Sequence, residues 1–130
     1  MKKRVTWSRR RAWRDVIAEC DGHTGYSHQW RQPFAQGLRK IVMASADSAA
    51  DRDVARAMGW RTFRVRTAEE AIGAREFACP ASDEAGKRRQ CIDCLACDGA
   101  ARGPSQASPV IIVHGAKARR FVPIVPIVAV

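Results

Sequence analysis

The sequence predicts a single α/β domain, residues 1–130, with a short, mainly parallel sheet, flanking helices and a four-cysteine metal-binding lobe. Three observations support this. The pattern of residues 38–76 predicts a strand, a helix and a strand, and residues 110–115 are predicted to form a third strand. Four of the five cysteines lie in residues 77–99. A chain of 130 residues with 46% apolar content suits one domain with a modest core.

The segment 38–76 has the pattern of a βαβ unit. Residues 38–45 are predicted to form its first strand. Ser48 is suited to cap a helix, with Asp51 three residues later as its capping-box partner, and Gly59 is suited to end it. Apolar residues then alternate with arginines over 61–66, which is typical of a strand. The short joins imply that the two strands are parallel.

The N-terminal residues 1–22 are predicted to form a basic amphipathic helix, with Trp13 and Cys20 buried on its apolar stripe. Its first turns carry a cluster of four arginines: Arg9, Arg10, Arg11 and Arg14. Positive charge at a helix N-terminus opposes the helix macrodipole, so this cluster favours a binding role. A solubilising surface is the alternative.

The chain is strongly basic, with a formal net charge of +10. The excess is concentrated in residues 1–40, which contain ten Lys or Arg against three Asp or Glu. Nucleic acid or another polyanion is therefore the expected partner. The loop after the first helix adds Trp30 and Arg31 as candidate contacts, with Trp30 or Tyr26 as a base-stacking platform. An ordered loop pinned by its aromatic residues is the alternative.

The cysteines follow the pattern Cys79-x11-Cys91-x2-Cys94-x2-Cys97. Four thiolates complete the tetrahedral shell of a structural zinc ion, and they also hold a [4Fe–4S] cluster. The two-residue spacers let the chain turn so that successive sulfurs point at one metal. Zinc is favoured because all four ligands are cysteine and no coordination position is left open. The cluster stays open as an alternative, because a cysteine run with a distant Cys-Pro is a common iron–sulfur arrangement.

Three polar residues are candidates for catalysis: His28, Asp47 and His114. Asp47 follows a predicted strand and His114 lies at the end of one, and the carboxyl ends of parallel strands are where ligands bind. The loop that bears His28 precedes the first predicted strand, so it reaches this edge only if it folds back.

The protein is expected to be cytoplasmic, with no membrane partner. Met1 is followed by a Lys- and Arg-rich stretch and not by the apolar core of a signal peptide. The longest apolar stretch is the tail, residues 121–130, and it is interrupted by Pro123 and Pro126. In a reducing compartment, clustered cysteines indicate metal or redox chemistry more often than disulfides.

Five short motifs resemble, in their order, those of a known family. They are Gly-Tyr-Ser-His-Gln-Trp-Arg at 25–31, Met-Ala-Ser-Ala-Asp-Ser at 43–48, Gly-Trp-Arg-Thr-Phe-Arg-Val-Arg at 59–66, Cys-Pro-Ala-Ser at 79–82 with the later cysteines, and Val-His-Gly at 113–115. The chain resembles, over about residues 5–115, the C-terminal part of a protein family of phages, plasmids and actinobacteria. Longer members carry an additional N-terminal cysteine-rich segment that suggests a radical-SAM-like or other iron–sulfur barrel. The resemblance implies a mobile-element origin and a metal at the four cysteines, and it implies no reaction.

These observations lead to one expected function and two alternatives. The first is a metal-stabilised, nucleic-acid-interacting accessory protein of a mobile genetic element. The second is an iron–sulfur enzyme, or a fragment of one, with a pocket at the carboxyl edge of the sheet. The third is an inhibitor that binds a host protein through the basic helix.

Overall fold

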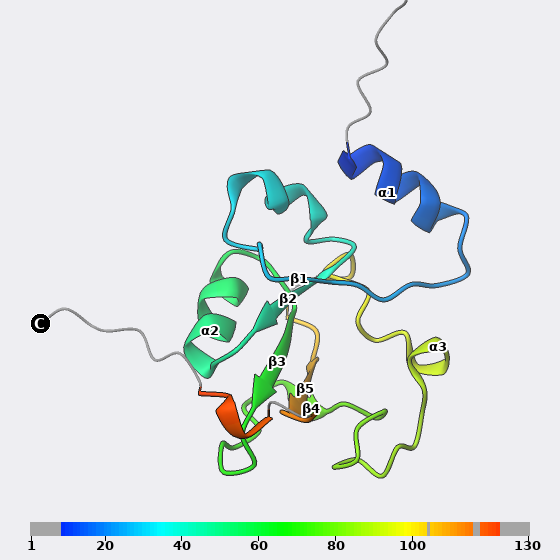
Figure 1. The fold of residues 1–130 in the computed structure, drawn as a ribbon. Coiled ribbons are helices and arrows are strands. Elements are labelled where there is room, and N and C mark those ends of the chain that lie inside the picture. The colour runs from blue at the N-terminus through cyan, green and yellow to red at the C-terminus, as the bar shows by residue number, and fades with distance from the viewer. Residues whose placement is uncertain (1–8, 104, 116–117, 123–130) are drawn as a thin grey trace, which may run out of the picture.

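The computed structural model describes residues 9–103, 105–115 and 118–122, and Figure 1 shows their arrangement. In chain order the elements are α1 (Arg9–Ala18), β1 (Tyr26–Ser27), the 3-10 helix η1 (Pro33–Leu38), β2 (Met43–Ala46), α2 (Ala49–Ala57), β3 (Thr62–Arg66), β4 (Glu76–Ala78), α3 (Cys91–Cys94), β5 (Ser108–Ile112) and the 3-10 helix η2 (Ala118–Arg120).

The strands form one five-stranded sheet in the order β1-β2-β3-β5-β4, and every neighbouring pair is parallel. The α/β class and the parallel β2-α2-β3 unit are therefore confirmed. The prediction was wrong about where the first strand begins, because residues 38–42 form the end of η1 and a turn. The strands β1 and β4 were missed because two or three residues are too short to show a period.

Helix α2 packs against β2 and β3 and buries one face of the sheet. Its start is fixed as predicted, because the Ser48 side chain caps the helix by accepting a hydrogen bond from the Asp51 N–H, at 3.0 Å. Ala44 and Ala46 are small enough for two buried indole rings, Trp30 and Trp60, to fill this side of the core.

The same face of β3 also holds two buried arginines, Arg64 and Arg66, which pair with acidic groups. Arg64 donates two hydrogen bonds of 2.9 Å to the Glu76 carboxylate, and Arg52 donates a third, of 2.7 Å. Burial alone would raise the pKa of Glu76, but the hydrogen bonds from Arg64 and the Gly73 N–H and the charge of Arg64 lower it overall. Arg66 pairs with Glu84 through one guanidinium nitrogen and also donates to the Thr67 and Glu70 carbonyls. Much of the positive charge of residues 41–78 therefore stabilises the fold.

Helix α1 stands apart from the sheet (Figure 1). Arg14 donates a hydrogen bond to the Gly37 carbonyl, yet Trp13 is 61% exposed and Cys20 is exposed as well. The prediction that Trp13 and Cys20 are buried is wrong, because an open hollow of about 430 Å³ separates the apolar stripe of the helix from Leu38, Ile41 and Val42. Of the apolar tail, only Phe121 and Val122 lie within the described residues.

Among the described residues, no helix combines the length and the apolar character needed to cross a bilayer.

Candidate metal centre and the adjoining sheet-face hollow

Three separate backbone elements supply the four cysteines. Cys79 directly follows β4, and its N–H donates to the Val110 carbonyl, at 2.9 Å, so it extends the parallel ladder. Cys91 and Cys94 are the first and last residues of the single-turn helix α3. Leu95 then adopts a left-handed conformation, with φ of 52°, and turns the chain so that Cys97 returns to the protein body. The two-residue spacers between Cys91, Cys94 and Cys97 are therefore each part of one turn of the chain.

Cys97 is the cysteine held most firmly by the rest of the fold. It is buried, and its carbonyl accepts a hydrogen bond from the Gly25 N–H just before β1. The next residue, Asp98, is held by Arg61, which donates to its carboxylate at 3.0 Å and to the Gly99 carbonyl at 2.9 Å. The Nε2 of His23 lies 3.1 Å from the Asp98 carbonyl.

The four cysteines line one small cavity of about 20 Å³, together with Tyr26 and Pro109 among others. The structure does not show the predicted metal-binding lobe itself: within the described part of the chain, no three or more His, Cys, Asp or Glu side chains are positioned to hold a metal ion. All five cysteines are free thiols. The structure thus establishes a shared cavity, and a ligand shell would require the thiols to move closer together.

The cavity changes the acidity of the groups within it. Burial raises the pKa of the Cys97 thiol to about 11; the hydrogen bond from Tyr26 acts against this, and Cys79, Cys91 and Cys94 add to it. Burial also raises the pKa of Tyr26, and the Cys97 sulfur raises it further. The raised pKa favours the protonated thiol of Cys97 at neutral pH, and any metal ion bound by this thiol would have to displace that proton.

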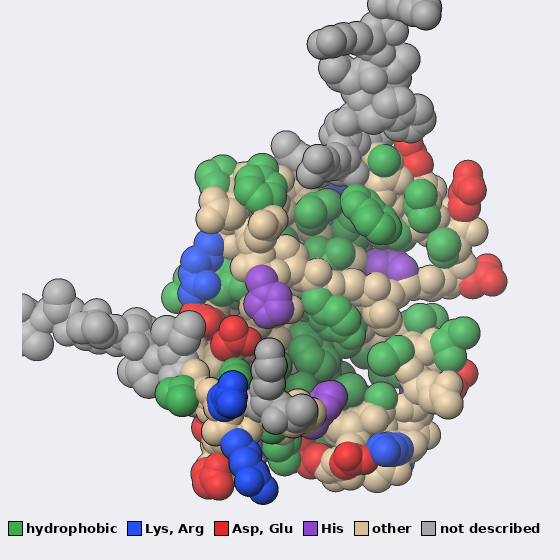
Figure 2. All heavy atoms as spheres, viewed as in Figure 1, with side chains coloured by type: hydrophobic (Ala, Val, Ile, Leu, Met, Phe, Trp, Pro, Cys, Tyr) green, Lys and Arg blue, Asp and Glu red, His purple; other side chains and the backbone are tan. Residues whose placement is uncertain are grey.

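A larger hollow of about 430 Å³, called the sheet-face hollow below, adjoins this cavity on the face of the sheet opposite α2. Because side chains alternate along a strand, Pro109, Ile111 and Val113 share this face, and the first lines the cysteine cavity while the other two line the hollow. Tyr26 lines both spaces. Figure 2 shows hydrophobic side chains gathered in the middle of the molecule, with histidine side chains around them.

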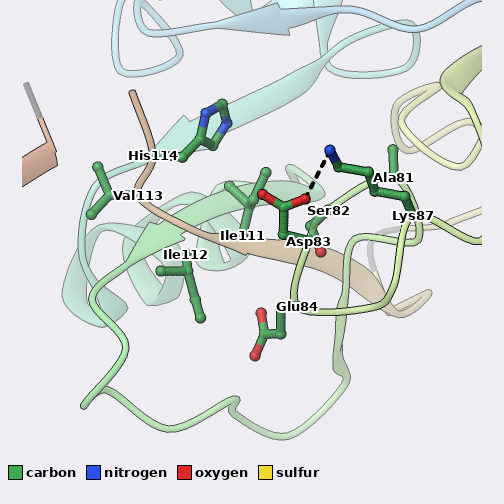
Figure 3. A pocket seen from close by; sticks show the side chains of 9 residues that line it. All are labelled: Ala81, Ser82, Asp83, Glu84, Lys87, Ile111, Ile112, Val113 and His114. Carbon is green, nitrogen blue, oxygen red and sulfur yellow. Dashed lines mark ion pairs between the residues drawn. The ribbon is translucent and has the colours of Figure 1, made fainter. Parts of the chain in front are cut away.

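A second hollow, also of about 430 Å³, lies beside the sheet-face hollow and shares Ile111, Val113 and His114 with it. Figure 3 shows its floor of strand residues facing the loop that follows Cys79. That loop contributes Asp83 and Lys87, which form an exposed ion pair at 2.9 Å. His114 therefore stands between two adjacent hollows at the carboxyl edge of the sheet.

The structure brings two of the three predicted catalytic candidates together. His28 and His114 both line the sheet-face hollow, because Tyr26–Ser27 is itself a parallel strand and His28 follows its carboxyl end. Asp47 lines neither hollow.

Of the residues predicted to contact nucleic acid, one is buried and two others are exposed. Trp30 is 1% exposed and donates its indole N–H to the Ser45 carbonyl, so the prediction that it stacks on bases is wrong. Arg31 is exposed, stacks on the Trp30 ring and pairs with Asp51. Arg14 is exposed on α1. The backbone of the other three arginines begins that helix, and their side chains lie outside the described structure.

Sequence reasoning missed the residues that support the cysteines. From the sequence, Arg61 was assigned only to an alternating strand. In the structure it is 1% exposed and donates hydrogen bonds to the Asp98 carboxylate and to the Gly99 and Ala107 carbonyls. The sequence did indicate that Arg61 has a partner, because an arginine at an inward-facing position of a strand needs a buried polar partner. The acidic partner comes from a distant loop, which the pattern could not reveal.

No protein-family model, no curated protein and no solved structure matches this chain.

Proposed function

We propose that Cys79, Cys91, Cys94 and Cys97 bind one metal centre, and that this centre stabilises the domain. The observation that carries the proposal is that all four cysteines, from three separate elements, line a single cavity. Zinc suits four thiolates with no open position, and a [4Fe–4S] cluster is the alternative for the same ligands. The metal would link the carboxyl end of β4 to the segment before β1, at opposite edges of the sheet.

The surroundings of the cysteines support this proposal. Cys91 is exposed and its neighbour Ile92 is 76% exposed, so α3 can move without disturbing the core. Cys97, in contrast, is fixed by Gly25 and by the Arg61–Asp98 pair. Binding would then draw the exposed thiols toward the fixed one. A site that closes around its metal is common, because preformed ligand shells are rare without the ion.

We further propose that the domain is a nucleic-acid-interacting accessory protein of a mobile genetic element. Its support is the arginine cluster at the start of α1, which is not required for helix stability. Helix α1 has no acidic residue in its first turn, and it projects from the body of the protein. The arginines of β3, by comparison, are buried in ion pairs, so α1 is the better candidate for phosphate contacts.

Replacing Arg9, Arg10, Arg11 and Arg14 together with glutamine should weaken binding to nucleic acid. Each lost phosphate contact should reduce the slope of log affinity against log salt by about 0.7–0.9, because fewer counterions are released. Salt-dependent titrations of the parent and the variant with labelled DNA and RNA measure both effects. A matched control replaces Arg52, which is paired with Glu76 inside the fold, and should keep the parent salt slope if the protein stays folded. Unchanged affinity in the quadruple variant would remove α1 from the interface, and no binding by the parent at low salt would remove the function.

A second candidate, an iron–sulfur enzyme, is favoured by one specific observation. The hollow that holds His28 and His114 adjoins the cysteine cavity, and Tyr26 forms part of both walls. Ligands of parallel sheets bind at the carboxyl ends of the strands, which is where these histidines lie. Broad visible absorbance of the purified protein would favour this candidate, whereas colourless protein containing zinc would count against it.

A further inference from the structure

We propose that the sheet-face hollow binds one unstacked base of a single-stranded nucleic acid. The proposal rests on the proposed nucleic-acid function and deepens it, because it assigns base contact to a surface distinct from the basic helix. The two surfaces differ in chemistry: α1 offers charge for phosphates, and the hollow offers an apolar floor with a polar rim.

The described residues leave part of one face of the sheet uncovered. Parallel sheets are almost always covered on both faces, because their strands are apolar on both sides. Within the described part of the chain, α2 packs on one face at β2 and β3, and the cysteine segment lies on the other face beside Pro109 and beside one edge of residues 111–114. Phe63, Val65 and Ile111 are only partly buried in the remaining part. This surface therefore favours an apolar, planar occupant.

Aromatic and polar side chains lie together around the hollow. The rings of Tyr26 and Phe63 pack edge to face, with centroids 5.0 Å apart and an interplanar angle of 62°. Aromatic side chains on an open sheet provide a platform on which unpaired bases stack. His28, His114 and Ser45 line the same hollow and offer donors and acceptors for the edge of a base. A base in a duplex is already stacked on its neighbours, so the occupant has to be single-stranded.

The net charge of the chain favours a nucleic acid over a second copy of the chain as the occupant. Two copies that each carry a formal charge of +10 repel one another, whereas a polyanion is attracted. The volume of about 430 Å³ lies within the range of small-molecule sites and suits a single base better than an extended protein surface.

The test compares a short oligonucleotide with an abasic strand of the same length, by fluorescence anisotropy at low salt. The parent protein should prefer the base-containing strand. Phe63→Leu keeps an apolar side chain but removes the ring, and should weaken binding of the base-containing strand by about fivefold to a hundredfold, the range that base stacking supplies. Its affinity for the abasic strand should stay unchanged. Phe34→Leu is the matched control, because Phe34 is an exposed phenylalanine on η1, outside the hollow, and should bind as the parent does.

The outcomes separate this inference from the proposed function. Equal affinity of the parent for both strands would overturn the base site and leave phosphate binding through α1 intact. Binding of neither strand would overturn both. If Phe63→Leu fails to fold, Phe63→Tyr retains the ring and should retain the preference for bases, and loss of that preference in folded Phe63→Tyr would contradict stacking at this position.

Discussion

Replacing Cys97 with serine is expected to eliminate metal binding and to destabilise the domain by several kcal/mol, on the order of 5. Cys97 is the buried cysteine among the five, and its carbonyl accepts a hydrogen bond from the Gly25 N–H in the segment that leads into β1. Serine is a poor substitute for a thiolate ligand, so the other three cysteines would lose the ion as well. Denaturant unfolding, followed by far-UV circular dichroism, together with metal content measured on the same sample, tests this expectation.

Two further serine variants show whether the effect belongs to the metal. Cys94→Ser should behave as Cys97→Ser does, although Cys94 is less buried, because both are proposed ligands of one ion. Cys20→Ser should change stability by less than about 0.5 kcal/mol, since Cys20 is exposed just past the end of α1 and its thiol donates to the Val16 carbonyl, a bond that a serine hydroxyl can also make. Full metal content in Cys97→Ser protein would contradict the assignment.

Replacing Gly99 with alanine is expected to destabilise the protein by about 4 kcal/mol, through strain and a clash together. Gly99 has φ of 93°, which L-residues rarely adopt. A Cβ there would lie 2.6 Å from the backbone nitrogen of Ile41 and from the carbonyl carbon of Lys40, and backbone atoms cannot move aside as a flexible side chain can. The loop that follows Cys97 would have to shift, so metal affinity should fall along with stability.

Gly86 provides the matched control for this variant. It also has positive φ, of 75°, but no atom lies within 4 Å of the position that a Cβ would occupy. Gly86→Ala should therefore cost only the backbone strain, about 1–2 kcal/mol. Thermal and denaturant unfolding of the two variants gives the comparison. Equal stability of Gly86→Ala and Gly99→Ala would show that the close approach to Ile41 and Lys40 does not constrain the loop.

The predictable part of the fold is the part with long local patterns. The βαβ unit was recognisable because Ser48 caps a helix and because arginines alternate with Phe63 and Val65 in the strand that follows. The short strands at Tyr26 and Phe77 were not recognisable, because they exist only through pairing with β2 and β5. The missing strand also explains why the position of His28 was uncertain: its place at the carboxyl edge depends on β1.

The cysteine spacing likewise indicated which residues belong together but not what surrounds them. The pattern grouped Cys79 with the later three, and all four line one cavity. Nothing in the spacing indicated that Arg61 and His23 hold the Asp98 segment, since these contacts join residues far apart in the chain. Exposure was the least predictable property. Trp30 and Trp13 were placed from their neighbours along the chain, and their burial is the reverse of what was predicted.

The most direct test of the central claim is metal analysis of the purified full chain, with a visible absorbance spectrum and a thiol titration on the same sample. A single centre held by Cys79, Cys91, Cys94 and Cys97 predicts about one zinc ion, or one iron–sulfur cluster, per chain. Only Cys20 should then react readily with a thiol reagent, because it is the exposed cysteine outside the cavity. Fully folded protein that contains no metal, and whose cavity thiols all titrate, would contradict the claim.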